Sequence, residues 1–116
     1  MPRTAITVTT PTRAGVTQPS TQASDSTNGM VVQNNTGAII LEVKNNNAGT
    51  QTISFPFRAS ATIDGVTPAD KTVSIATGVT KLIGPFPPGY YNQNGADLYV
   101  NPSIDTDLAI RAYAVV

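Results

Sequence analysis

The residues most able to bind a metal ion lie near the C-terminus. Asp105 and Asp107 stand two positions apart, and Asn101 and Ser103 precede them with the same spacing. Oxygen ligands at alternating positions are a minimal sign of a calcium loop, but the segment lacks the full ligand spacing and the bidentate glutamate of a complete one. Aspartates in turns also accept hydrogen bonds from their own backbone. We therefore expect a turn at this place, with no metal and no other cofactor.

Groups suited to acid–base or nucleophilic catalysis are scarce in this chain of 116 residues. It contains no histidine and no cysteine, and its single glutamate, Glu42, lies in the middle of a β-rich run. No serine stands in a nucleophile-elbow sequence, and no glycine-rich phosphate-binding loop occurs. We predict that the protein is not an enzyme and that it acts by contact with another macromolecule.

Charge and hydropathy argue against two classes of partner. Seven basic and seven acidic residues give a net charge of zero, and they are scattered from Arg3 to Arg111 rather than clustered as in nucleic-acid-binding proteins. Apolar runs such as residues 38–41 are far shorter than the ~20 residues that span a bilayer. The N-terminus lacks the apolar stretch of a signal peptide. We predict no nucleic-acid partner, no membrane span and no export through a signal peptide.

The elements that would position these residues are short β-strands. Runs rich in β-branched and aromatic residues alternate with clusters of asparagine, glycine and proline, and no window supports a long amphipathic helix. The predicted strands cover residues 30–33, 38–44, 50–55, 57–63, 71–76, 80–84, 96–101 and 108–115. Strands of this length and spacing predict an all-β fold, with a single antiparallel β-sandwich, jelly-roll-like or immunoglobulin-like, over residues 30–116.

Alternation along these strands predicts which side chains face inward. The expected core consists of Ile39, Leu41, Val43, Ile53, Phe55, Phe57, Ala59, Ala61, Ile63, Val73, Ile75, Leu82, Leu98, Val100, Leu108 and Ile110. Pro56 has no N–H to donate to a sheet, so we expect a corner there. The dipeptide Asp64-Gly65 is typical of a hairpin turn.

Residues 1–29 differ in composition from the rest. Threonine, serine, glutamine, proline and alanine dominate residues 9–28, and such a sequence cannot offset its ordering entropy by burial. The sequence AITVT at residues 5–9 alternates apolar and polar residues, which suits a strand that pairs with an unspecified partner. We predict an extended N-terminal arm that adds a strand to a neighbouring molecule. A disordered terminus is the alternative.

Two groups of residues are candidates for contact with that neighbour. Those on the arm are Arg3, Ile6, Val8 and Arg13. The second group is Tyr90 and Tyr91, in the proline-rich loop PFPPGYYNQNG at residues 85–95, because aromatic side chains are enriched at interfaces. An alternative for this loop is that one tyrosine packs against the edge of the sandwich and caps the core.

Several sequence features, taken in order over residues 11–116, carry a family resemblance. They are the Thr/Pro/Ala-rich arm, the Asn28-Gly29 pair, the NTG stretch at residues 35–37 followed by IILEVKN and TISF, and TKLIGPFPPGYYNQNG followed by DLYVNPS and a final AIRAYAVV. In this order they resemble the small head decoration, or cement, proteins of tailed bacteriophages. The resemblance implies a structural virion protein, made in the host cytoplasm, that binds the major capsid protein on the outer surface of the capsid and stabilises the shell.

Two interpretations remain open after this resemblance. A decoration protein is compatible with a monomer and with a homo-oligomer such as a trimer. The alternative function is a carbohydrate-binding or adhesion β-sandwich module on a virion or cell surface, with Tyr90, Tyr91 and the adjacent asparagines as its site. Sugar stacking normally uses a denser aromatic platform than this chain offers, with four tyrosines, three phenylalanines and no tryptophan. The sequence therefore favours the virion protein.

Overall fold

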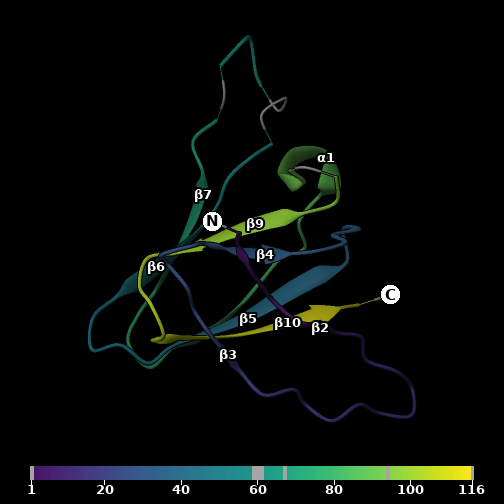
Figure 1. Ribbon diagram of the computed structural model, residues 1–116, viewed down its shortest axis with the longest axis vertical. Helices are drawn as coiled ribbons and strands as arrows, with labels where there is room; N and C mark the ends of the chain where they lie inside the picture. The colour runs from purple at the N-terminus through teal and green to yellow at the C-terminus, as the bar shows by residue number, and fades with distance from the viewer. Residues whose placement is uncertain (1, 59–61, 67, 94, 116) are drawn as a thin grey trace.

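Two β-sheets packed face to face form the body of the protein (Figure 1). The computed structural model describes residues 2–58, 62–66, 68–93 and 95–115. Its strands are β1 (Thr4–Ala5), β2 (Val8–Thr9), β3 (Gln22–Ala23), β4 (Met30–Val32), β5 (Ile39–Asn45), β6 (Gln51–Phe55), β7 (Lys71–Ile75), β8 (Thr80–Ile83), β9 (Leu98–Pro102) and β10 (Leu108–Ala114). Within the described ranges the helical structure is one short helix, α1 (Pro88–Tyr91). The predicted all-β sandwich is confirmed.

The sheets are mixed rather than purely antiparallel. The first has the strand order β1-β4-β9-β6-β7, and the second has the order β2-β10-β5-β8, with β3 also pairing with β10. All of these pairs are antiparallel except β1 with β4 and β2 with β10, which run parallel. The antiparallel prediction was made for residues 30–116 and holds among their strands, since both parallel pairs involve the N-terminal strands β1 and β2.

Alternation along the central strand β5 explains how the two layers meet. Leu41 and Val43 are buried, whereas Glu42 between them is half-buried on the opposite face. In the pairing of β5 with β10, Ala112 lies opposite Leu41 and Ile110 lies opposite Val43. Paired residues share a face of the sheet, so these two strands together present an apolar surface to the other sheet.

Most of the predicted core is buried as expected. Exposed fractions of at most 1% are found for Ile39, Leu41, Val43, Ile53, Phe55, Ile75, Leu98, Val100, Leu108 and Ile110. Val73 is partly buried and packs against this cluster, and Phe57 is half-buried. The core also contains Ile6, Met30, Val32, Phe86 and Ala112, which the strand pattern does not identify.

The core prediction is wrong for two residues. Ile63 is 72% exposed and Leu82 is 71% exposed. In β8 it is Ile83 that lies opposite Leu41 and packs against the core, while Leu82 lies opposite Glu42 on the outer face. Because side chains alternate, an error of one residue in phase exchanges the inner and outer faces of a strand.

The predicted strand over residues 57–63 does not form in its described part. Residues 57, 58 and 62 have no strand structure, and Ile63 makes an isolated bridge to Val66. The predicted core residues Ala59 and Ala61 lie outside the described residues. The chain leaves the sandwich after β6, at the position where Pro56 cannot donate to a sheet.

The N-terminal residues join the chain's own sheets instead of extending away as the predicted arm. β1 pairs with β4 in the first sheet, and β2 pairs with β10 in the second. Ile6, between the two strands, is 4% exposed and belongs to the core. Residues 10–21 then leave the sandwich as a wide loop before the chain returns in β3 (Figure 1).

Candidate interaction surface

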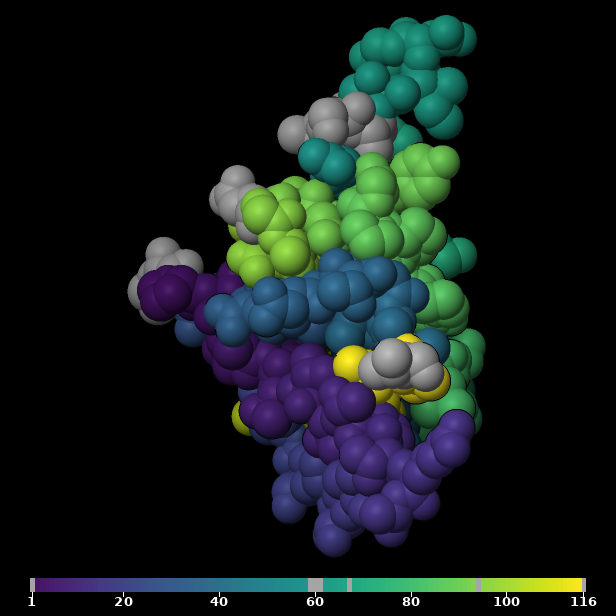
Figure 2. Space-filling model, turned by 90° about the vertical axis from the view of Figure 1, so that its right-hand side faces the viewer, coloured from purple at the N-terminus to yellow at the C-terminus, as the bar shows by residue number. Residues whose placement is uncertain are grey.

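A hairpin turn between β6 and β7 projects from one end of the molecule (Figures 1 and 2). The backbone N–H groups of Ile63 and Val66 each donate to the other residue's carbonyl oxygen at 2.9 Å. Between them, Asp64 and Gly65 have φ angles of 51° and 80°. Positive φ at both central residues is the conformation of a type I′ turn, which confirms the predicted Asp64-Gly65 turn.

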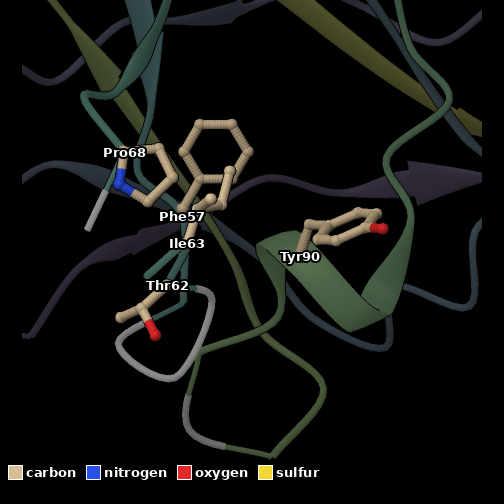
Figure 3. A pocket seen from close by; sticks show the side chains of 5 residues that line it. All are labelled: Phe57, Thr62, Ile63, Pro68 and Tyr90. Carbon is tan, nitrogen blue, oxygen red and sulfur yellow. The ribbon is translucent and has the colours of Figure 1, made fainter. Parts of the chain in front are cut away.

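The side chains at this end of the molecule form an apolar tip, made of Phe57, Ile63, Val66, Pro68 and Tyr90. Ile63, Val66 and Tyr90 are 72%, 66% and 60% exposed. A cavity of about 390 Å³ opens between the turn and the helix, lined by Phe57, Thr62, Ile63, Pro68 and Tyr90. In Figure 3, Phe57, Ile63 and Pro68 gather on one side of it, and Tyr90 lies across from them on α1.

The helix α1 fixes the position of Tyr90. Pro88 occupies the first turn, where the missing N–H of a proline is tolerated, and the N–H groups of Tyr90 and Tyr91 both donate to the carbonyl oxygen of Pro87 at 3.1 Å. The N–H of Arg58 donates to the carbonyl oxygen of Tyr90 at 2.7 Å. This last bond ties the start of the projecting segment to the helix, so the two sides of the tip are held together.

Tyr91 points the other way and connects the tip to the core. Its ring stacks on Phe57 with centroids 4.9 Å apart and meets the edge of Phe86 at 5.4 Å. Phe86 is 3% exposed and lies 4.7 Å from Phe55 in the core. Burial raises the pKa of Tyr91 above its ordinary value of 10.0. Tyr91 therefore caps the core, as the alternative interpretation of the loop proposed, and only Tyr90 of the pair is exposed for contact.

Asn35 is a residue of this region that sequence reasoning missed. It is 2% exposed, and its side-chain Nδ2 donates to the carbonyl oxygen of Phe86 at 3.0 Å and to Oδ1 of Asn92 at 2.7 Å. Its Oδ1 accepts from the N–H of Gly37 at 3.1 Å. A fully bonded buried amide of this kind fixes loop geometry, because breaking any bond leaves a polar group unpaired. The signal in the sequence was its place in an Asn-Asn-Thr-Gly turn, which is too common to identify a buried residue.

The candidate contacts near the N-terminus have different environments. Ile6 is buried, and Val8 packs against the core, so neither side chain is free to bind another molecule while the segment is docked. Arg3 lies 3.9 Å above the ring of Tyr99, and its Nη1 donates to Oδ1 of Asn101 at 2.6 Å. Arg13 is exposed on the loop over residues 10–21. Of the arm candidates, Arg13 alone has its side chain in solvent.

The aspartates considered as calcium ligands have hydrogen-bond partners from other parts of the chain. Oδ1 of Asp105 accepts from the N–H of Ser26 at 2.5 Å, and its Oδ2 accepts from the hydroxyl of Thr27 at 3.0 Å. Asp107 accepts from Nδ2 of Asn47 at 2.7 Å. The bonds from Ser26 and Thr27 hold the pKa of Asp105 below its ordinary value. The described residues contain no group of three or more side chains suited to a metal ion.

Nothing in the described part of the chain forms a helix long and apolar enough to cross a bilayer. Comparison of the sequence and the structure with protein-family models, with curated proteins and with solved structures finds no match. Among the described residues, the apolar tip combines exposed hydrophobic side chains with a hydrogen-bonded turn and an apolar cavity.

Proposed function

We propose that this chain is a structural virion protein that binds the outer surface of a tailed-phage capsid and stabilises the shell, without enzymatic activity. Its partner is the major capsid protein, and the apolar tip is the contact surface. The observation that carries this proposal is the projection of Ile63 and Val66 from a tight turn beside Tyr90, all three largely exposed. The sequence resemblance to head decoration proteins supplies the class of partner.

The physical chemistry of the tip supports a role in binding. Burying a side chain of the size of isoleucine, valine or tyrosine contributes about 1.5 to 3 kcal/mol. Contiguous exposed apolar groups on an otherwise polar monomer mark an interaction site more often than single ones do. On a shell, even a modest contact is multiplied if several sites are engaged together, as in other multivalent assemblies.

A carbohydrate-binding function receives less support from the same region. The cavity is lined by apolar side chains, apart from the hydroxyl groups of Thr62 and Tyr90. A sugar buried there would leave most of its hydroxyl groups without hydrogen-bond partners, and each such group costs about 1 to 3 kcal/mol. We expect no glycan binding at this cavity, and the experiment below includes a glycan array to detect it.

The test uses empty shells assembled from a tailed-phage major capsid protein, the proposed partner. We expect the protein to co-sediment with these shells, and the Ile63→Asp/Val66→Asp double variant to remain in the supernatant. The matched control is Leu82→Asp, because Leu82 is 71% exposed, as Ile63 is at 72%, but lies on β8 outside the tip. This control should bind as the parent protein does.

Two results would contradict the proposal. If the parent protein stays in the supernatant but binds to a glycan array, the carbohydrate function replaces it. If the double variant and the parent protein co-sediment equally, the tip is not the contact surface. Circular dichroism and thermal unfolding of each variant show that a loss of binding does not come from a loss of folding.

A further inference from the structure

The docking of residues 2–9, here called the docked segment, depends on contacts that every copy of the chain can offer. We propose that the docked segment exchanges between copies, so that residues 2–9 of one molecule occupy the groove of a second copy, formed by β4, β9 and β10. This inference concerns copies of this chain alone and is independent of the shell proposal. It rests on the contacts inside the groove and on the length of the connection outside it.

Main-chain pairing holds both ends of the docked segment. Thr4 and Ala5 are in register with Met30 and Val31, and the N–H of Ile6 donates to the carbonyl oxygen of Val31 at 2.8 Å. In the other sheet, Val8 is in register with Ala112. Each strand is only two residues long. Main-chain pairing of this kind binds an added strand without regard to which molecule supplies it.

Side chains of the body recognise the docked segment specifically. Between β1 and β2 the chain crosses from one sheet to the other. There Gln22 donates to the carbonyl oxygen of Ala5 at 2.6 Å and accepts from the N–H of Thr7 at 3.2 Å. The hydroxyl of Thr4 donates to Oδ2 of Asp25 at 2.5 Å. Ile6 fills a place in the core. The groove is thus shaped for this sequence.

Gly29 lies against Arg3 of the docked segment in a backbone conformation that favours glycine. A side chain at Gly29, where φ is 73°, would place its Cβ 2.4 Å from Nη1 of Arg3. The absence of that side chain lets the guanidinium lie over Tyr99 and donate to Asn101. These partners all belong to the body of the sandwich, and they would receive the docked segment of a second copy in the same way.

The connection between the docked segment and the body is long and weakly held. Residues 10–21 are exposed apart from the half-buried Pro19, whose carbonyl oxygen accepts from Nε of Arg111 at 2.7 Å. Fully extended, a linker of this length spans about 40 Å. The whole molecule measures 43 × 37 × 25 Å along its principal axes. The linker can therefore carry the docked segment to a neighbouring copy.

Exchange leaves the contacts of the groove unchanged, so the balance between closed and exchanged forms depends on protein concentration and on the linker. Domain swapping is a route to association for this reason, because the same element makes the same contacts in a different molecule. A long linker lets the chain close on itself, and a linker too short to turn back excludes the closed form.

Introduced cysteines test the exchange with the natural linker. The chain has no cysteine of its own, and Thr9 is in register with Tyr113 across neighbouring strands, which lie about 4.8 Å apart, within reach of a disulfide. T9C and Y113C proteins are mixed, unfolded, refolded together at high concentration and oxidised. We expect a disulfide between the two different chains, identified by peptide mass mapping. Its absence, while the T9C/Y113C double variant forms the bond within one chain, would overturn the proposal.

A linker deletion tests the same inference by mass. Removal of residues 11–21 joins Thr10 to Gln22, so that Thr9 and Gln22 are at most about 7.6 Å apart. Their partners on β10, Tyr113 and Ile110, are three residues apart, roughly 10 Å along the strand. The closed form is then possible only if the two-residue strand β3 leaves β10, so we expect twice the mass of one chain in sedimentation. A Gly/Ser replacement of equal length is the control and should behave as the parent. A deletion variant that stays monomeric at all concentrations contradicts the exchange.

Discussion

Asn35 and Asn92 hold each other through two hydrogen bonds across 57 residues of sequence. Nδ2 of Asn35 donates to Oδ1 of Asn92 at 2.7 Å, and Nδ2 of Asn92 donates to the carbonyl oxygen of Asn35 at 3.0 Å. The first residue lies between β4 and β5, and the second directly follows α1. The pair therefore fixes the end of the helix that carries Tyr90 to the body of the sandwich.

Replacement of the buried member of this pair should destabilise the protein. Asn35→Ala leaves the carbonyl oxygen of Phe86 and the side chain of Asn92 without their donors, and we expect a loss of about 1 to 3 kcal/mol in the free energy of unfolding. Urea denaturation followed by circular dichroism measures it. Asn46→Ala, at an exposed asparagine, is the matched control and should stay within about 0.5 kcal/mol of the parent. Equal stability of the two variants would show that the pair does not hold the loop.

The same substitution at two leucines on neighbouring strands should have very different effects on stability. Leu41 is fully buried on β5, whereas Leu82 on β8 is 71% exposed. We expect Leu41→Asp to abolish folding, because an unpaired carboxylate cannot be buried, and Leu41→Ala to cost about 2 to 5 kcal/mol. Leu82→Asp places a second carboxylate opposite Glu42 on the outer face, so it should cost no more than about 1 kcal/mol. Thermal unfolding compares them, and an unfolded Leu82→Asp protein would place that side chain in the core.

The sequence predicted the parts of the fold that depend on local alternation. Ile39, Leu41 and Val43 show a clear period of two in a long strand, and their burial was predicted correctly. β8 was harder, because Leu82 and Ile83 are adjacent, both apolar, and part of a strand of four residues. Such a strand has no internal pattern that fixes its phase. Only its register against β5 decides which residue faces inward.

The candidate site depended on contacts between distant parts of the chain, which a single sequence does not show. The loop composition predicts Tyr90 as a contact, whereas the strand pattern that runs through Ile63 predicts a core residue. Its exposure follows from the turn at Asp64-Gly65, which leaves the sandwich. For Ile6 the sequence predicts a contact on an extended arm, because its groove is built by strands that begin more than twenty residues later. Composition describes the segment itself and says nothing of that groove.

The two adjacent tyrosines should separate stability from binding. Tyr91 packs between Phe57 and Phe86, so we expect Tyr91→Ala to lower the free energy of unfolding by about 2 kcal/mol. Tyr90 is 60% exposed, and Tyr90→Ala should leave stability within about 0.5 kcal/mol while weakening co-sedimentation with shells. Urea denaturation and sedimentation are measured on both variants. A Tyr90→Ala protein that binds shells as the parent does would remove this residue from the contact.

Lowering the pH should reduce the stability of the fold, because two aspartates near the N-terminal residues stabilise it in their charged form. The hydroxyl of Thr4 is the main cause that lowers the pKa of Asp25 below its ordinary value of 3.8, and the N–H of Ser26 is the main cause for Asp105. A carboxylate whose pKa is lower in the folded protein stabilises the fold above its unfolded pKa. That stabilisation is lost as the pH falls through the folded pKa. Both residues therefore contribute at neutral pH and lose their contribution below about pH 4.

The pH dependence can be measured as a difference between variants. Asp105→Asn and Thr4→Val each remove one of these hydrogen-bonded carboxylate contacts, and Thr4→Val does so without changing charge. We expect both variants to be less stable than the parent near neutral pH. The gap in the free energy of unfolding should then close as the pH falls from about 6 to about 2, because the parent loses the same contribution by protonation. A gap that stays constant over this range would mean that the charged forms of Asp25 and Asp105 do not stabilise the fold.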